Sequence, residues 1–147
     1  MNTTNASSPD TYQSPRVFRI VLVEDEPGDV YLLEKALKRL NLTYELTHFE
    51  DGELAMRLLA EPERPTPDLI LVDLNLPKRD GFEVLRSVRS RPALVGVPVG
   101  IFTSSEAAAD RSRASLLGAE RYIHKPAELE QFIKEVGDAI EGMLHRA

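Results

Sequence analysis

Residues 68–81 read DLILVDLNLPKRDG, and this stretch decides which fold the chain is expected to adopt. Its apolar run from Leu69 to Val72 shows no polar alternation, which is typical of a central parallel strand covered on both faces. The run ends at Asp73, and a polar loop follows in which Gly81 is free to take a positive φ. A carboxylate at the end of a buried strand is costly unless its charge is used. Asp73 is therefore either a helix cap or a nucleophile or metal ligand at a loop rim.

Composition narrows the class of protein. The 147 residues are 42% hydrophobic and 29% charged, which suits one globular domain with a proper core. A formal net charge of −6 argues against nucleic acid as a direct partner, because phosphate contacts need clustered Lys and Arg. The absence of Cys excludes disulfides and thiolate metal sites. No apolar run approaches the ~20 residues that span a bilayer, and the N-terminus lacks a signal-peptide core, so a cytoplasmic location without membrane contact is expected.

Strand and helix patterns alternate along the chain. Residues 1–15 are polar and predict a flexible tail, which leaves residues 16–147 as the domain. Apolar or mixed strands are predicted at Val17–Val23, Tyr44–Phe49, Leu69–Val72, Val97–Phe102 and Arg121–His124. Helices are predicted at 28–40, from Gly52 onward, and at Phe82–Ser90, Glu106–Leu117 and 128–144. Five such pairs predict an α/β fold with a doubly wound parallel sheet and right-handed crossovers.

Polar side chains follow the predicted strands at the edge where α/β sheets bind ligands. These residues are Glu24 and Asp25, Asp73, Thr103 and Lys125. Three carboxylates close together need a positive charge among them, and an all-oxygen cluster favours Mg²⁺. A metal, an ammonium and a hydroxyl around one carboxylate suit phosphoryl transfer with that carboxylate as the nucleophile. The alternative is a charged rim without chemistry.

The motifs at these strand ends point to one family. They are VEDE at Glu24 and Asp25, DLNLPKRDG at Asp73, FTS at Thr103 and YIHKP at Lys125. Together they resemble the receiver domain of a two-component response regulator, with the CheY-like, flavodoxin-like (βα)5 fold, over residues 16–144. The resemblance implies phosphoryl transfer from a histidine kinase, with the receiver catalysing its own phosphorylation and dephosphorylation.

The same resemblance implies a role for each matching residue. Asp73 would be the phosphoacceptor, and Mg²⁺ would be held by Glu24, Asp25, Asp73 and the backbone carbonyl of Asn75. Thr103 and Lys125 would contact the phosphoryl group, and Tyr122 would change rotamer with the active state. Pro126 would shape the turn after Lys125, and a cis Lys125–Pro126 peptide is expected there.

A finer likeness concerns the stretches EDEPGDVYLLEKAL and DLNLPKRDG. They are similar to single-domain regulators that serve phytochrome-type histidine kinases, which makes such a kinase a candidate partner. Two positions depart from the wider pattern. Glu24 stands where many receivers have Asp, so its longer side chain would reach the metal through water. Ser105, two residues after Thr103, replaces a bulkier or charged group and leaves the phosphate lifetime open.

The signal is expected to leave through the fourth helix, the fifth strand and the fifth helix. This face includes residues 107–117, Tyr122, His124 and the outer side of 128–144. The five pairs account for the chain through Leu144, so no output domain is expected. The face would therefore meet a kinase, a target or a second copy in a homodimer.

Two other functions remain open at this point. A Mg²⁺-dependent phosphatase or phosphomutase with an aspartyl nucleophile usually carries a second Asp where this chain has Asn75, and it needs a cap domain. A scaffold that has lost phosphorylation would not need every acceptor, metal and switch position filled.

The remaining charged residues are interpreted as ordinary surface groups. His48 and His145 are expected at the surface, and packing is favoured over a pH or partner role for His124. The pairs Arg86–Arg89 and Arg111–Arg113 are expected on solvated helix faces.

Overall fold

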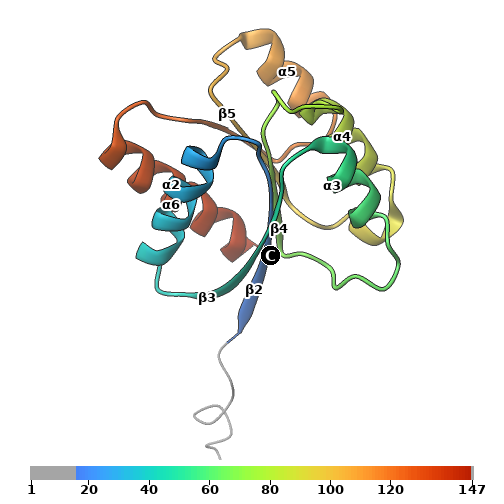
Figure 1. Cartoon of the computed structure of the whole chain (residues 1–147), viewed down its shortest axis with the longest axis horizontal. Coiled ribbons are helices and arrows are strands. Elements are labelled where there is room, and N and C mark those ends of the chain that lie inside the picture. The colour runs from blue at the N-terminus through green and yellow to red at the C-terminus, as the bar shows by residue number, and fades with distance from the viewer. Residues whose placement is uncertain (1–15, 147) are drawn as a thin grey trace, which may run out of the picture.

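The computed structural model describes residues 16–146 and confirms a parallel α/β fold (Figure 1). Its single sheet has the order β3-β2-β4-β5-β6, and every neighbouring pair is parallel. The strands are β2 (Val17–Val23), β3 (Thr43–Phe49), β4 (Leu69–Val72), β5 (Val99–Thr103) and β6 (Arg121–His124). The predicted tail, residues 1–15, lies outside the described residues.

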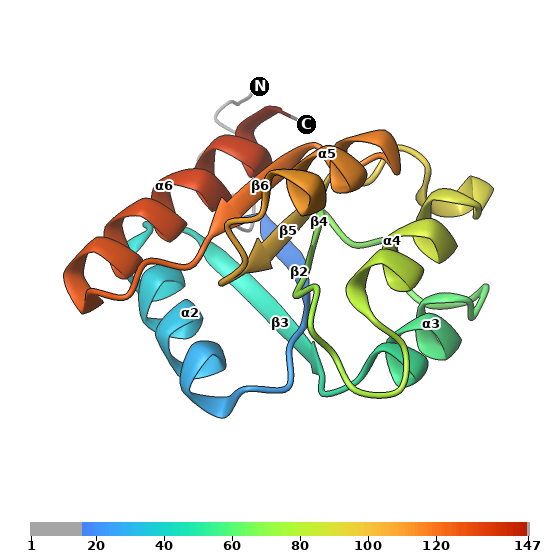
Figure 2. The ribbon, with the colours of Figure 1, turned by 90° about the horizontal axis from the view of Figure 1, so that it is seen from above.

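Helices cover both faces of the sheet (Figure 2). They are α2 (Pro27–Arg39), α3 (Gly52–Leu59), α4 (Gly81–Arg89), α5 (Ala108–Leu116) and α6 (Leu129–Arg146), with a short 3₁₀ turn η2 at Pro92–Leu94 that the sequence did not predict. The pair α2 and α6 packs on one face, and α3, α4 and α5 lie on the other. Pro27 occupies the first turn of α2, where its missing N–H costs nothing.

The alternation of side chains along each strand divides the core into two clusters. On β4, Ile70 and Val72 join the cluster under α3 and α4, whereas Leu69 and Leu71 join the cluster under α2 and α6. All four side chains of this central strand are fully buried. Each contributes about 1.5–3 kcal/mol relative to an exposed position, so β4 is fixed from both sides.

Strand register brings the functional positions to one edge. Val23 pairs with Val72, and Thr103 pairs with His124. Glu24, Asp73 and Lys125 each follow a paired strand end directly, so their backbones emerge at the same edge of the sheet. The prediction that the strand-end residues share one rim is confirmed.

The loop after β4 differs from expectation in how its glycine is used. Gly81 does not take a positive φ; its N–H donates to the Leu74 carbonyl, and a Cβ there would collide with the backbone of Asp73. The positive φ of this loop belongs to Lys78, at 69°. Helix α4 then starts with a capping box in which Asp80 and Glu83 accept from each other's backbone N–H.

The expectation of a cis Lys125–Pro126 peptide is wrong in this structure, because every peptide bond within residues 16–146 is trans. The trans form is the preferred one for X–Pro bonds. Four residues, 125–128, separate β6 from α6, so the chain has room to change direction with Lys125 already turned inward.

Three of the four arginines expected on solvated faces make specific contacts. Arg89 donates to the carbonyls of Gly118 (2.9 Å), Val97 (2.8 Å), Val95 (3.2 Å) and Leu94 (3.3 Å). Arg111 lies over the Tyr122 ring and Arg113 over the Phe82 ring, at 4.3 and 4.1 Å from the ring centroids. Arginine can stack its planar guanidinium on a ring or on peptide groups, which the helical pattern alone does not reveal.

Candidate functional site

Lys125 lies at the centre of the charged edge. Its side chain is only 8% exposed, and its Nζ donates to Glu24 Oε1 at 2.6 Å, Asp29 Oδ2 at 2.8 Å and Asp73 Oδ2 at 3.0 Å. The ammonium also lies 4.8 Å from the centroid of the Phe102 ring. One buried cation therefore holds two carboxylates that directly follow β2 and β4 and a third from the first turn of α2.

The predicted carboxylates form a compact oxygen cluster. Glu24, Asp25 and Asp73 each offer an oxygen, and these oxygens lie within 4.8 Å of one another. Glu24 and Asp73 are buried, whereas Asp25 is exposed and leaves the cluster open to solvent. Carboxylate oxygens with an open side are what a hard divalent cation that keeps several waters requires. The residues present thus fit Mg²⁺.

The electrostatics of the cluster are set by burial and by Lys125. Burial raises the pKa of Glu24 to about 7, against the lowering effect of its hydrogen bond to Lys125, and the neighbouring Asp73 adds to the rise. Burial alone lowers the pKa of Lys125. Its hydrogen bonds to Asp29 and Glu24 and the charge of Asp73 outweigh that effect, so the pKa lies above the ordinary value. The ammonium stays charged, and the Glu24 carboxyl group, with its raised pKa, responds to pH near neutrality.

Asp73 itself is oriented by both of its neighbours. Asn75 N–H donates to Asp73 Oδ1 at 3.2 Å, while Lys125 donates to Oδ2 at 3.0 Å. Asp73 does not cap α4, because Asp80 fills that position. This geometry removes the helix-cap interpretation of Asp73.

Thr103 and Tyr122 meet at the start of the β5–α5 loop. Thr103 is fully buried, and its Oγ1 accepts from the N–H of Ser105 at 3.3 Å. The Tyr122 hydroxyl donates to the Ser105 carbonyl at 3.0 Å. The two predicted switch residues are therefore joined through a third residue.

Two residues at this edge were not predicted to take part. Asp29, in the first turn of α2, binds Lys125. His48 is exposed as expected, yet its Nε2 lies 2.6 Å from the Glu24 carbonyl oxygen, to which the ring donates. The acids crowded into residues 24–29 were a signal for the first contact. Nothing in the sequence pointed to the second.

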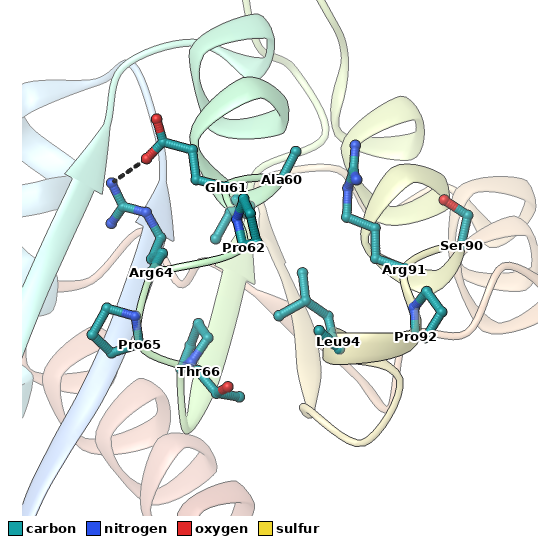
Figure 3. Close-up of a pocket in the computed structure, with 13 residues that line it drawn as sticks. Ala60, Glu61, Pro62, Arg64, Pro65, Thr66, Ser90, Arg91, Pro92 and Leu94 are labelled. Atoms are coloured by element: carbon teal, nitrogen blue, oxygen red, sulfur yellow. Dashed lines mark ion pairs between the residues drawn. The ribbon is translucent and has the colours of Figure 1, made fainter.

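A separate pocket of about 340 Å³ lies at the opposite edge of the sheet (Figure 3). It is lined by residues 59–62 and 64–67, from the end of α3 and the loop after it, and by residues 90–94, which follow α4. Arg91 forms part of one wall, and its buried Nε has no hydrogen-bond partner among the described residues. None of the predicted site residues lines this pocket, so the chemistry belongs to the charged edge.

Comparison with known proteins identifies the family of the chain and bears on the enzyme alternative. The sequence pattern described as "Response regulator receiver domain" matches residues 20–137. The chain belongs to the response regulator receiver family. Receivers of this family accept a phosphoryl group and interact with histidine kinases. The family is one of signalling domains rather than of conventional enzymes, and the phosphatase alternative is set aside.

The relatives of this receiver agree with the finer resemblance. Response regulator Rcp1 of Synechocystis sp. is 37% identical over 131 residues, which cover 86% of this chain and 88% of Rcp1. The structure of the phosphorylated cyanobacterial phytochrome response regulator RcpA has a TM-score of 0.83 and 38% identity, covering 90% of this chain and 97% of RcpA. The Mn²⁺-bound form of Rcp1 has a TM-score of 0.80 and 35% identity, covering 88% and 96%.

The helices of the receiver also bear on the membrane prediction. None of those described between residues 16 and 146 combines the length and apolar character needed to cross a membrane.

Proposed function

We propose that Asp73 is the phosphoacceptor of this receiver and that a histidine kinase, of phytochrome type, is its phosphodonor. The observation that carries the proposal is the buried Asp73 carboxylate, held by Lys125 and Asn75 at the open edge of the sheet. The similarity to Rcp1 and to the phytochrome response regulator RcpA supports the choice of kinase.

The proposed reaction is a single displacement at phosphorus. A carboxylate oxygen of Asp73 attacks the phosphoryl group on the kinase histidine, an O–P bond forms, and the N–P bond breaks. The imidazole leaves with the electron pair of that bond and takes a proton. Lys125, which already contacts Asp73, stabilises negative charge on the transferred phosphoryl oxygens. Hydrolysis by water would reverse the switch.

Glu24, Asp25, Asp73 and the backbone carbonyl of Asn75 are the groups we assign to Mg²⁺. When bound, the cation neutralises charge on the phosphoryl oxygens. Glu24 and Asp73 are buried, which restricts their side chains, whereas Asp25 is exposed and leaves the site open to solvent. Cation binding also relieves the repulsion among the three carboxylates.

Thr103 and Tyr122 are the residues that we expect to change conformation when Asp73 is phosphorylated. The Thr103 hydroxyl would turn toward the aspartyl phosphate, and the Tyr122 ring would change its packing beside α5. The surface formed by α5, β6 and α6 would then change. Pro126 lies at its margin, directly after Lys125.

This surface carries a groove suited to a second copy of the chain. The groove has a volume of about 620 Å³. Its lining includes the basic residues Arg111 and Arg121 and the acidic residues Glu106, Glu135 and Asp138. In a two-fold dimer each positive group can meet a negative group of the other copy. We therefore propose phosphorylation-dependent homodimerisation through this groove.

Intact-mass spectrometry after incubation with Mg²⁺ and a small phosphodonor tests the proposed acceptor. The wild type should gain one phosphoryl group, and Asp73→Asn should gain none. Asp80→Asn, in the same loop, is the matched control and should be labelled. Equal labelling of Asp73→Asn would contradict the assignment, and an unlabelled wild type would favour the scaffold alternative.

A further inference from the structure

The N–H donors of Lys125 are all engaged by carboxylates of the described residues. A protonated lysine carries three such donors. They are directed to Glu24 Oε1 at 2.6 Å, Asp29 Oδ2 at 2.8 Å and Asp73 Oδ2 at 3.0 Å. Contact between Lys125 and a phosphoryl group on Asp73 therefore requires that one carboxylate gives up its hydrogen bond.

The three carboxylates differ in what it costs them to lose the ammonium. Glu24 is fully buried, and the side chain of Asp73, the proposed acceptor, is only 8% exposed. The Asp29 side chain is 26% exposed, so water can replace the hydrogen bond that it loses. A charge left unpaired on the buried Glu24 has no such replacement. Release of Lys125 is therefore cheapest at Asp29.

The place of Asp29 in the fold also lets it carry its charge without Lys125. It lies in the first turn of α2, where the helix dipole stabilises a negative charge. Glu24 and Asp73 directly follow strands β2 and β4, whereas Asp29 belongs to a helix. Rotation of its own side chain is enough to separate it from Lys125, and neither strand end has to move.

We propose that Asp29 is the partner of Lys125 in the unphosphorylated state and that it competes with the phosphoryl group for the ammonium. This inference rests on the proposed function of Asp73. When a phosphoryl group reaches Asp73, the N–H that Asp29 accepted turns to a phosphoryl oxygen, and Asp29 is left to water. Asp29 is thus a positioning residue that acts through Lys125 and lowers the affinity of the receiver for a phosphoryl group.

Titration of the full chain with beryllofluoride in saturating Mg²⁺, followed by NMR, measures this competition. Asp29→Asn keeps the shape of the side chain but replaces a charge-assisted hydrogen bond by a neutral one about half as strong. The variant should bind the analogue about tenfold more tightly than the wild type. Asp29→Ala, which removes the acceptor altogether, should change the affinity in the same direction.

A matched control and the ionic strength separate direct competition from a general effect of charge. Glu26→Gln removes one negative charge at the exposed N-cap of α2 and should change the affinity by less than about twofold. The effect of Asp29→Asn should persist at an ionic strength of about 0.5 M, because the ion pair that it removes is in contact and partly buried. An effect that falls to that of Glu26→Gln would show that Asp29 acts only as a distant charge, and would overturn the proposal.

The ammonium signal of Lys125 gives a readout that a purely structural role of Asp29 would not move. In the free protein its nitrogen chemical shift should differ between the wild type and Asp29→Asn, because Asp29 accepts one of its hydrogens. With beryllofluoride and Mg²⁺ bound, the two shifts should become nearly equal, because Lys125 has left residue 29 in both proteins. A difference that persists in the bound state would show that Lys125 keeps Asp29 and releases another carboxylate, which contradicts the proposal.

The outcomes also separate this competition from the proposed function. If the wild type binds the analogue at Asp73 and Asp29→Asn binds it no more tightly, the competition is wrong and the role of Asp73 stands. If the wild type does not bind the analogue at Asp73, the proposed function and the competition fail together.

Discussion

Helices α5 and α6 flank the same edge strand, β6, yet they are held in opposite ways (Figure 2). Helix α6 buries a full apolar stripe, formed by Phe132, Val136, Ala139, Ile140, Met143 and Leu144. Helix α5 buries Ala114 and is otherwise fixed by polar contacts, with Ser105 at its beginning and Arg89 bound to Gly118 at its end. Individual hydrogen bonds can be exchanged, whereas a packed stripe cannot shift without losing many contacts at once. We therefore propose that α5 is the helix that moves on phosphorylation and that α6 keeps its position.

The largest expected effect on stability comes from truncating a side chain in the buried apolar stripe of α6. Ile140→Ala in α6 should lower the free energy of unfolding by about 2–5 kcal/mol, because it leaves a cavity at a fully buried position. Leu116→Ala in α5 removes an exposed side chain and should change it by less than about 0.5 kcal/mol. Urea unfolding of the two variants measures both values. Equal losses would contradict the contrast between the helices.

The pH dependence of stability tests the electrostatics of the buried charge cluster that contains Glu24. In the metal-free protein the pKa of Glu24 is about 7, above the ordinary value of 4.5. At Glu24 the folded state then binds more protons than the unfolded state between these values, so the contribution of this residue to stability falls as pH rises from about 4.5 to 7 and levels off above. A rise of this size corresponds to roughly 3 kcal/mol.

Glu24→Gln keeps the shape of the side chain and removes its titration. The decline in stability over this pH range should therefore be shallower in the variant than in the wild type. Parallel pH profiles of the two proteins in thermal unfolding would show that Glu24 does not titrate there. Mg²⁺ competes with protons at the same carboxylates, so its affinity for the wild type should rise over the same range.

Substitution of Arg89 tests whether its hydrogen bonds hold the end of α5 in place. Arg89→Met removes the hydrogen bonds to Gly118 and to the loop after η2, and it should cost about 2 kcal/mol of unfolding free energy. Arg86→Met, on the same helix but exposed, is the matched control. Equal stability of the two variants by urea unfolding would show that the Arg89 contacts do not anchor α5.

A smaller effect concerns the metal. Mg²⁺ at 10 to 100 times its dissociation constant should stabilise the wild type by about 1.4–2.7 kcal/mol. Asp25→Ala should be more stable than the wild type without metal, because it relieves carboxylate repulsion, and it should not respond to Mg²⁺. Thermal unfolding with and without Mg²⁺ gives both results. A Mg²⁺ response that survives Asp25→Ala would contradict the site.

Much of the fold could be predicted because its signals are local. The apolar runs of β2, β4 and β5 and the helical spacing of apolar residues in α6 appear in the sequence. The Asp80–Glu83 capping box also has a local signal, an Asp followed three residues later by a Glu. The trans Lys125–Pro126 bond shows the limit of a resemblance: it gives an expectation for a turn, while the peptide geometry depends on packing around it.

In the site, too, some features could be predicted from the sequence and others could not. The strand-end residues were predictable because parallel strands place their carboxyl ends at one edge. The contact of Asp29 with Lys125 joins residues 96 positions apart, and the Arg89 contacts depend on how two loops meet. The Ser105 network depends on side-chain rotamers. Such contacts follow from tertiary packing, which no local pattern encodes.

Hydrogen exchange of the wild type, with and without beryllofluoride and Mg²⁺, tests the central claim most directly. The account predicts altered protection at the loops that hold Asp25, Asp73 and Lys125, and also in α5 and at Tyr122, while the buried stripe of α6 is unchanged. Changes confined to the three loops, or changes of equal size in α5 and in the α6 stripe, would contradict it.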